Sequence, residues 1–175
     1  MAAKKKGYTL IILLFALSVL SIGLMIAVPV WQTQIQREKE EELIFRGKQY
    51  VEAVRLFQLK YPGTFPRTLE ELIEEKYLRR LYKDPMTEHG KWNIILLYQG
   101  VSTKEGGAPQ RVLSIPQNAL QATANPRIMG VQSSSAENSI KIYEDQSSYD
   151  KWLFFYGKAP NTMPEIIYYG QEERD

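Results

Sequence analysis

The chain contains no cysteine, a single histidine, and no acidic residue before Glu38. The absence of cysteine excludes a disulfide framework and thiolate metal sites. Because His89 is the sole histidine, a zinc site is not expected, and a serine- or histidine-based hydrolase would have to use that residue. His89 stands between Glu88 and Gly90 in an expected loop, so we interpret it as a surface histidine. The sequence predicts a protein that is not an enzyme.

Neither charge is in large excess, because 22 lysines and arginines face 20 acidic residues and leave a formal net charge of +2. Such a balance gives no electrostatic reason to expect nucleic-acid binding. The composition therefore directs attention to the distribution of apolar residues.

A long apolar run follows three lysines at the N-terminus. Lys4, Lys5 and Lys6 precede Gly7, and residues 8–31 are almost entirely apolar. As a helix this run would rise roughly 36 Å, enough for a hydrocarbon core of about 30 Å. A cleaved secretory signal fits poorly, since such signals have apolar cores of about 7–15 residues and Pro29 spoils the candidate cleavage site. An uncleaved signal anchor remains an alternative.

The positions of the basic residues favour a cytoplasmic N-terminus. Lys4, Lys5 and Lys6 lie directly against the apolar run, with no acid beside them. Basic residues also follow the run, at Arg37, Lys39, Arg46 and Lys48. Their number alone does not decide the orientation.

The junction Gly7-Tyr8-Thr9-Leu10-Ile11 resembles the class III leader junction of type IV pilins and type II secretion pseudopilins. The resemblance implies that a prepilin peptidase removes residues 1–7, cleaving between Gly7 and Tyr8, and N-methylates Tyr8. Pro29 falls where many pilins carry a proline that kinks or locally melts the helix. Proline removes a backbone donor and clashes with the preceding turn, which gives a bend a mechanical cause.

Ile12 departs from the family pattern, which places glutamate four residues beyond the first mature residue. That glutamate is understood to pair with the N-terminal amine of a neighbouring subunit, inside an apolar core where an unpaired charge is costly. Resemblance implies that minor subunits at the tip of a filament can dispense with it. A divergent paralogue is the other interpretation. The absence of cysteine leans toward a pseudopilin, since many type IV pilins close their C-terminal region with a disulfide.

Residues 32–61 are expected to continue the helix in amphipathic form. Apolar residues recur at steps of three and four, with Gly47 on the same face: Leu43, Ile44, Tyr50, Val51, Val54 and Phe57. The charged residues of this stretch have two interpretations, a solvated face or contacts to neighbouring subunits. They are Arg37, Glu38, Lys39, Glu40, Glu41, Glu42 and Arg46.

Residues 62–175 are expected to form one globular domain. Pro62, Gly63 and Pro66 end the long helix. Thr68 and Glu71 have the spacing of a capping box. A second amphipathic helix is predicted over residues 69–81, before Asp84-Pro85, and this succession resembles the G-type pseudopilins.

The remaining sequence favours strands separated by exposed loops. The predicted strands are residues 92–98, 111–115, 128–131, 140–143 and 152–156; the loops are 100–109 and 116–126. Residues 139–143 and 152–155 suggest two strands joined by a polar turn, and the tail after Tyr169 is expected to fray. We interpret Trp92, Trp152, Phe154 and Phe155 as packing residues rather than a ligand cage.

Calcium is the one cofactor that needs consideration, because G-type pseudopilins often bind it near their sheet. No Asp-x-Asp-x-Asp-Gly pattern is present. Glu144, Asp145 and Asp150 could supply oxygens, but a solvated hairpin turn explains them equally well. No metal or other cofactor is assigned.

The expected fold is α+β and type IV pilin-like, with a long N-terminal helix packed on a small antiparallel sheet. The expected function is that of a pseudopilin of a type II secretion-like system, whose filament drives protein export. Its expected partners are other pseudopilins, the prepilin peptidase and an inner-membrane assembly platform. The expected location is the bacterial inner membrane, with a periplasmic domain. A minor type IV pilin and a signal-anchored ligand-binding or enzymatic domain remain alternatives.

Overall fold

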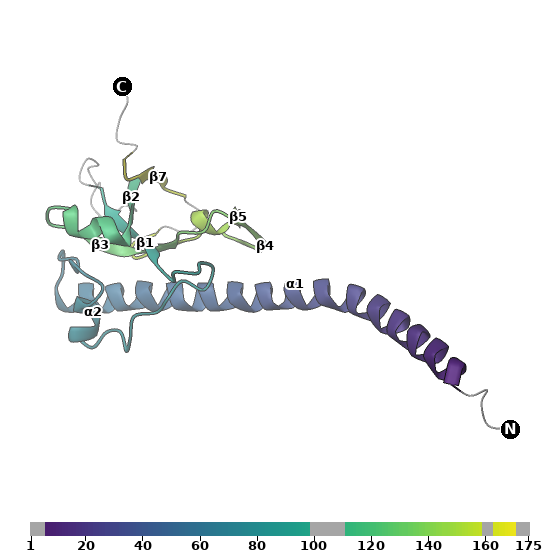
Figure 1. The fold of residues 1–175 in the computed structure, drawn as a ribbon. Helices are drawn as coiled ribbons and strands as arrows, with labels where there is room; N and C mark the ends of the chain where they lie inside the picture. The colour runs from purple at the N-terminus through teal and green to yellow at the C-terminus, as the bar shows by residue number, and fades with distance from the viewer. Residues whose placement is uncertain (1–5, 99–110, 159–162, 171–175) are drawn as a thin grey trace. The chain divides into compact units, whose positions relative to one another are not determined.

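The computed structural model describes residues 6–98, 111–158 and 163–170, apart from the side chains of residues 6, 7 and 26. The leader residues 1–5, the predicted loop 100–109 and the tail 171–175 lie outside the described residues. The chain divides into two units, Met1–Glu38 and Lys39–Asp175. Figure 1 shows the elements in chain order.

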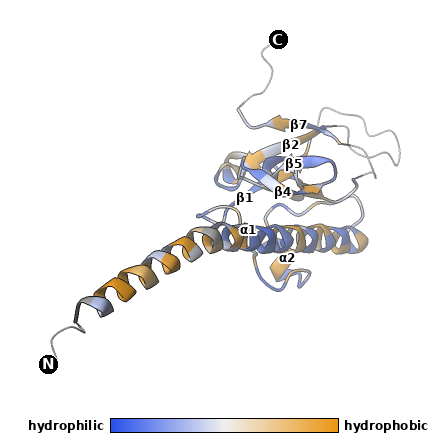
Figure 2. Ribbon diagram, turned by 90° about the vertical axis from the view of Figure 1, so that its right-hand side faces the viewer, coloured by the Kyte–Doolittle hydropathy of each residue, from blue (hydrophilic) through white to orange (hydrophobic). Residues whose placement is uncertain are grey.

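Helix α1 runs from Lys6 to Lys60 and belongs to both units. It ends where predicted, since Pro62 cannot continue it and Gly63 adopts a positive φ of 78°. Its first part is apolar along its length, and its second part alternates apolar and polar residues (Figure 2).

One face of α1 residues 39–60 forms part of the core, as the periodicity predicted. Leu43, Tyr50, Val54 and Phe57 are buried, while Ile44 and Val51 are partly buried against the same core. Gly47 lies where the helix meets Phe154, and a Cβ at this glycine would stand 2.3 Å from the phenyl ring. Only glycine permits this close approach of helix and sheet.

The second helix is much shorter than predicted. Helix α2 spans Glu71–Glu74 only, and the rest of the predicted residues 69–81 form turns. The chain reverses at Lys76, whose φ is 63°, and the Tyr77 and Lys76 amides donate to the Leu72 and Ile73 carbonyls. This is a Schellman cap, and it ends the helix although the apolar periodicity continues.

Thr68 and Glu71 make one bond of the predicted capping box, although α2 begins only after Glu70, which makes no side-chain cap bond. The Glu71 amide donates to the Thr68 hydroxyl at 3.2 Å. The Glu71 carboxylate accepts from the Arg67 amide rather than from that of Thr68.

Five strands form one sheet in the order β6-β3-β1-β2-β7. Their bounds are β1 Trp92–Leu97, β2 Arg111–Pro116, β3 Ile128–Ser133, β6 Leu153–Phe155 and β7 Glu165–Tyr168. Four of the five were predicted, but β7 was not. Because β7 pairs parallel with β2, the sheet is antiparallel-rich rather than wholly antiparallel. Between β2 and β3, the 3₁₀ helix η1 (Gln117–Ala122) occupies part of the predicted loop 116–126.

A separate hairpin corrects the predicted pairing of residues 139–143 with 152–155. Strand β4 (Asn138–Tyr143) pairs instead with β5 (Gln146–Ser148), while β6 pairs with β3. Glu144 and Asp145 form the two-residue turn with φ values of 50° and 61°, as a type I′ turn requires. The 3₁₀ turn η2 (Tyr149–Lys151) then leads into β6.

The four aromatic residues interpreted as packing residues are buried in the core. The relative exposures of Trp92, Trp152, Phe154 and Phe155 are all 3% or less. Trp92, Trp152 and Phe154 pack between α1 and the sheet, whereas Phe155 joins a second apolar cluster. The core of the second unit is therefore built from both sides of its sheet.

Candidate functional site

The predicted processing junction lies at the start of α1. Gly7 and Tyr8 both fall within the helix, and the Tyr8 side chain is 68% exposed. Ile12, one turn further on, is 50% exposed. Cleavage and methylation at this junction stay predictions.

The apolar surface of α1 is the largest feature of the first unit. Its large apolar side chains are exposed on every side of the helix: Tyr8, Leu10, Ile11, Ile12, Leu13, Leu14, Phe15, Leu17, Val19, Leu20, Ile22, Leu24, Met25, Val28, Val30 and Trp31. A helix that is apolar all round belongs in a core or a membrane. Among the described residues, α1 is the one helix long and apolar enough to cross a bilayer.

Pro29 does not interrupt α1, which is continuous from Lys6 to Lys60. Local melting of the helix at this proline is therefore not observed, and a kink stays a prediction. The nearby hydroxyl of Thr33 donates to the Pro29 carbonyl at 3.0 Å, and Ser18 and Ser21 bond to carbonyls one turn earlier in the same way. These bonds satisfy the hydroxyl groups within the helix, as an apolar environment demands.

Glu40 fits neither interpretation of the charged stretch, because it is neither solvated nor free to contact a neighbouring subunit. Its side chain is fully buried. The carboxylate accepts hydrogen bonds from the Ile140 amide at 2.7 Å, the Lys141 amide at 3.0 Å and the Tyr149 hydroxyl at 2.7 Å. A buried carboxylate is stable only when it is bonded in this way. Glu40 therefore fastens the β4–β5 hairpin to α1.

Sequence spacing did contain a signal for Glu40. It lies three residues before Leu43 and seven before Gly47, on the face of α1 that is buried. The neighbouring acids behave as expected of a polar face: Glu41 pairs with Lys141 at 2.7 Å and Glu42 with Arg46 at 2.7 Å. The partners of Glu40 are about a hundred residues away in the sequence, so no local pattern could name them.

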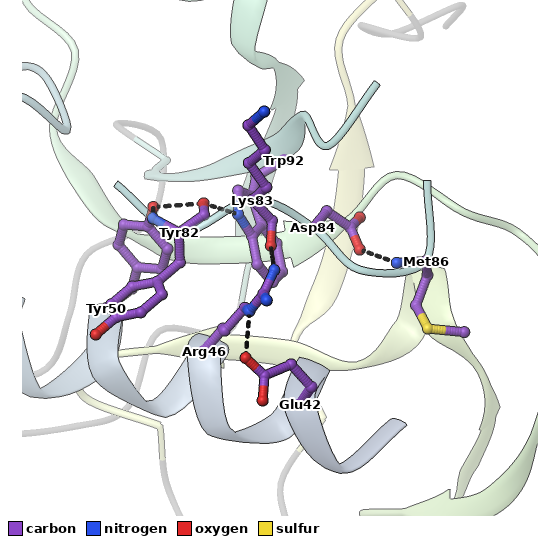
Figure 3. Close-up of polar contacts among 8 residues, drawn as sticks. All are labelled: Glu42, Arg46, Tyr50, Tyr82, Lys83, Asp84, Met86 and Trp92. Carbon is purple, nitrogen blue, oxygen red and sulfur yellow. Dashed lines mark hydrogen bonds and ion pairs between the residues drawn. The ribbon is translucent and has the colours of Figure 1, made fainter. Parts of the chain in front are cut away.

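A polar network joins α1 to the segment before β1 (Figure 3). The Tyr50 hydroxyl donates to the Tyr82 carbonyl and accepts from the Tyr82 amide, both at 2.9 Å. The Trp92 indole N–H donates to the same carbonyl, and Arg46 donates to the Lys83 carbonyl. Burial raises the pKa of Tyr50 to about 12, so its hydroxyl stays protonated at neutral pH.

Asp84 is the second buried acid of the domain. Its carboxylate accepts from the Met86 amide at 2.9 Å, the Ser133 hydroxyl at 2.8 Å and the Ser134 amide at 3.2 Å. Burial raises its pKa, although these hydrogen bonds act in the opposite direction. The Asp84-Pro85 loop is thereby tied to the end of β3.

An open groove of about 470 Å³ lies beside this network. Tyr82, Leu81 and Leu120 supply apolar lining, while Lys83, Lys91 and His89 supply polar groups. His89 is exposed in a turn, as predicted.

Of the acids considered as calcium ligands, Glu144 and Asp145 lie in the turn between β4 and β5, and Asp150 lies in η2. Glu144 forms an ion pair with Lys158, and Asp150 accepts from the Ser148 hydroxyl. Across residues 6–98, 111–158 and 163–170, no three histidine, cysteine, aspartate or glutamate residues gather closely enough to hold a metal ion. The hairpin turn accounts for Glu144 and Asp145.

The arrangement of one long N-terminal helix packed on an antiparallel-rich sheet is consistent with a pilin-like layout. No family model matches the chain, and neither a curated protein nor a solved structure does. The likeness to pilins and pseudopilins therefore stays a prediction from the residues.

Proposed function

We propose that the chain is a pseudopilin, a structural subunit that a prepilin peptidase processes and that assembles into a periplasmic filament. The observation that carries the proposal is the apolar surface of α1, exposed from Tyr8 to Trp31 directly after the leader-like junction. A membrane can cover this surface before assembly, and other subunits can cover it afterwards. The fold is proposed to be type IV pilin-like.

The mechanism would be mechanical rather than catalytic. After removal of residues 1–7, the helix would stay in the inner membrane with the domain in the periplasm. An assembly platform would then draw subunits into a filament, with apolar helices at its centre. Because lipid is already apolar, close packing between helices would contribute more than transfer out of the bilayer. Growth of the filament would move folded cargo outward.

Ile12 sets this subunit apart from others of the proposed class. An acid at this position would need a partner inside the filament, whereas isoleucine needs none. The residue fits a minor subunit at the tip of a type II secretion pseudopilus or a type IV pilus, and it equally fits a divergent subunit that repeats along its filament.

A signal-anchored ligand-binding domain is the second candidate, and the groove beside Tyr82 favours it. Its lysines and histidine could receive an anionic ligand over an apolar floor. This candidate predicts that residues 1–7 remain attached, because an anchor requires no peptidase.

Mass spectrometry of the full chain extracted from membranes separates the two candidates. In cells with the peptidase, the pseudopilin proposal expects a chain that begins at methylated Tyr8. In cells without it, the same proposal expects the intact chain. A Gly7→Ile variant is the matched control, since its leader should be retained in both strains. Retention of residues 1–7 in peptidase-positive cells would overturn the proposal, and so would a chain that begins after Trp31.

A further inference from the structure

The β4 strand exposes both of its isoleucines, as it does Asn138, while Tyr143 packs on the core and the 38% exposed Lys141 side chain pairs with Glu41. Ile142 is 74% exposed and Ile140 is 40% exposed, whereas Lys141 and Tyr143 between and beside them are partly buried. A strand on a domain surface normally shows the opposite alternation. The outward isoleucines therefore form an apolar face that nothing in the described chain covers.

The fold holds β4 in this register from two sides. Glu40 binds the Ile140 and Lys141 amides, and the Tyr143 ring packs against those of Trp152 and Phe154, with both centroid distances 5.4 Å. A slip of one residue would bury the isoleucines, but it would expose Tyr143 and leave the Glu40 carboxylate without its partners. The exposure of the isoleucines is thus imposed by buried groups.

The hairpin turn beside this face is acidic. Glu144 is paired with Lys158, whereas Asp145 is exposed and has no ion pair within the described ranges. This negative turn disfavours docking of the hairpin on an anionic lipid surface.

Unpaired positive charge lies in the polar stretch of α1. The Glu41 carboxylate forms an ion pair with Lys141, and the Glu42 carboxylate forms one with Arg46. Arg37 and Lys39 are exposed, and neither has an ion pair among the residues that the structure describes; Glu38 between them is also exposed and accepts from Gln34, so the stretch carries one net positive charge. One chain therefore carries both an apolar, acidic patch and an exposed basic stretch.

We propose that the outward face of β4, formed by Ile140 and Ile142 beside Asp145, docks against the Arg37–Lys39 stretch of α1 in a second copy of this chain. The contact joins two different patches, so it can repeat from copy to copy; it forms a filament where the rotation between copies does not close into a ring, and it is not the contact of an isologous dimer. The isoleucines supply apolar contact, and Asp145 opposite Lys39 sets orientation. The inference rests on the proposed function, because only copies side by side in a filament meet in this way.

Photo-crosslinking of the full chain in its native membranes tests the contact. A benzophenone amino acid replaces Ile142 in one variant and Ser147, exposed on β5, in a matched control. A third variant carries it at Phe15 and reports packing of the apolar helices. We expect position 142 to crosslink to the Arg37–Lys39 stretch of a second copy, and position 147 to do so much less.

The three positions separate failure of the inference from failure of the proposed function. If Phe15 links copies while position 142 links only lipid, its own chain or another protein, the docking contact is wrong and the filament proposal survives. If Phe15 links neither copies of this chain nor any other subunit, the proposed function fails with it.

A charge exchange tests the orientation of the contact. Asp145→Lys should lower the crosslink yield from position 142 about fivefold, the effect of losing one exposed ion pair. Adding Lys39→Asp should restore most of that yield, because the pair is then re-formed with its charges reversed. Failure of the double variant to recover would overturn the assigned orientation.

Discussion

Glu40 is the residue whose removal should damage the domain most specifically. Glu40→Ala removes the carboxylate that accepts from the Ile140 amide, the Lys141 amide and the Tyr149 hydroxyl. An unsatisfied buried donor costs about 1–3 kcal/mol, so we expect the free energy of unfolding to fall by about 3 kcal/mol. Urea unfolding followed by tryptophan fluorescence measures the change.

Glu41→Ala is the matched control for this variant. Glu41 lies next in the chain, but it is exposed and contacts Lys141 only through its side chain. An exposed ion pair contributes little to stability, so this variant should unfold close to the parent chain. Equal losses from the two variants would contradict the role assigned to Glu40.

Asp84 should make stability depend on pH in the direction opposite to most acids. Because burial raises its pKa, the folded carboxyl takes up a proton at a higher pH than the unfolded one. Its contribution to stability therefore grows as pH falls toward the usual aspartate value of about 3.9, and declines as pH rises through the window above it. The unfolding free energy of the parent chain relative to Asp84→Asn should thus increase between pH 6 and about pH 4.

Glu41→Gln provides a comparison of opposite sign. The hydrogen bond and charge of Lys141 lower the pKa of Glu41, so its contribution is lost as pH falls. Urea unfolding of both variants across the same pH range measures the two trends. If the Asp84 difference shrinks on acidification, its folded pKa is not raised.

At the scale of the elements, α2 ends in a cap in which Lys76 adopts the left-handed conformation, and the cost of this conformation can be tested. An L-residue in this conformation costs about 1–2 kcal/mol, which glycine avoids, while glycine loses about 0.5–1 kcal/mol through greater freedom in the unfolded chain. Lys76 is exposed, and no ion pair of it is described. We expect Lys76→Gly to stabilise the domain by about 0.5–1 kcal/mol.

Lys76→Ala separates the backbone effect from loss of the lysine side chain. Alanine has a Cβ and meets the same strain as lysine, so this variant should show no gain. Thermal unfolding of the two variants side by side measures the difference. A glycine variant no more stable than the alanine variant would exclude strain at this cap.

The elements also show how far sequence periodicity could predict the fold. It predicted α1, its buried face and four of the sheet strands, because each depends on local apolar spacing or a local breaker. It failed for α2, where the Schellman cap at Lys76 ends the helix although the apolar spacing continues through Leu78 and Leu81. It also failed for the hairpin, because Glu144 and Asp145 are unusual residues for a type I′ turn.

The bonding partners of the two buried acids, Glu40 and Asp84, could not be predicted, because these partners are distant in the sequence. Asp84 meets Ser133, and Glu40 meets Tyr149, through tertiary structure alone. Of the two acids, only Glu40 could have been suspected to be buried, because it has helical spacing with Leu43. The predicted processing junction is the reverse case, because the resemblance on which it rests lies in the contiguous residues Gly7 to Ile11 and does not depend on the fold.

At the scale of the whole molecule, the two units differ in the surface that they expose. All buried side chains among the described residues belong to the second unit, and Glu40 is the first of them along the chain. The first unit exposes apolar residues from Tyr8 to Trp31. We therefore expect the fragment 32–175 to fold in water without detergent, and the chain 8–175 to require a membrane or detergent.

Cooperative unfolding and membrane partition together test this division. Fragment 32–175 should unfold in one transition at the temperature found for the full chain in detergent, since none of its core is removed. It should remain in the soluble fraction, while the full chain sediments with membranes. A Leu13→Lys, Leu20→Lys variant of the full chain is the matched control, since each lysine adds about 3 kcal/mol to the cost of crossing the bilayer. If fragment 32–175 unfolds gradually or aggregates, the apolar helix is part of the domain's own core; if the lysine variant stays fully in membranes, the helix is not its anchor.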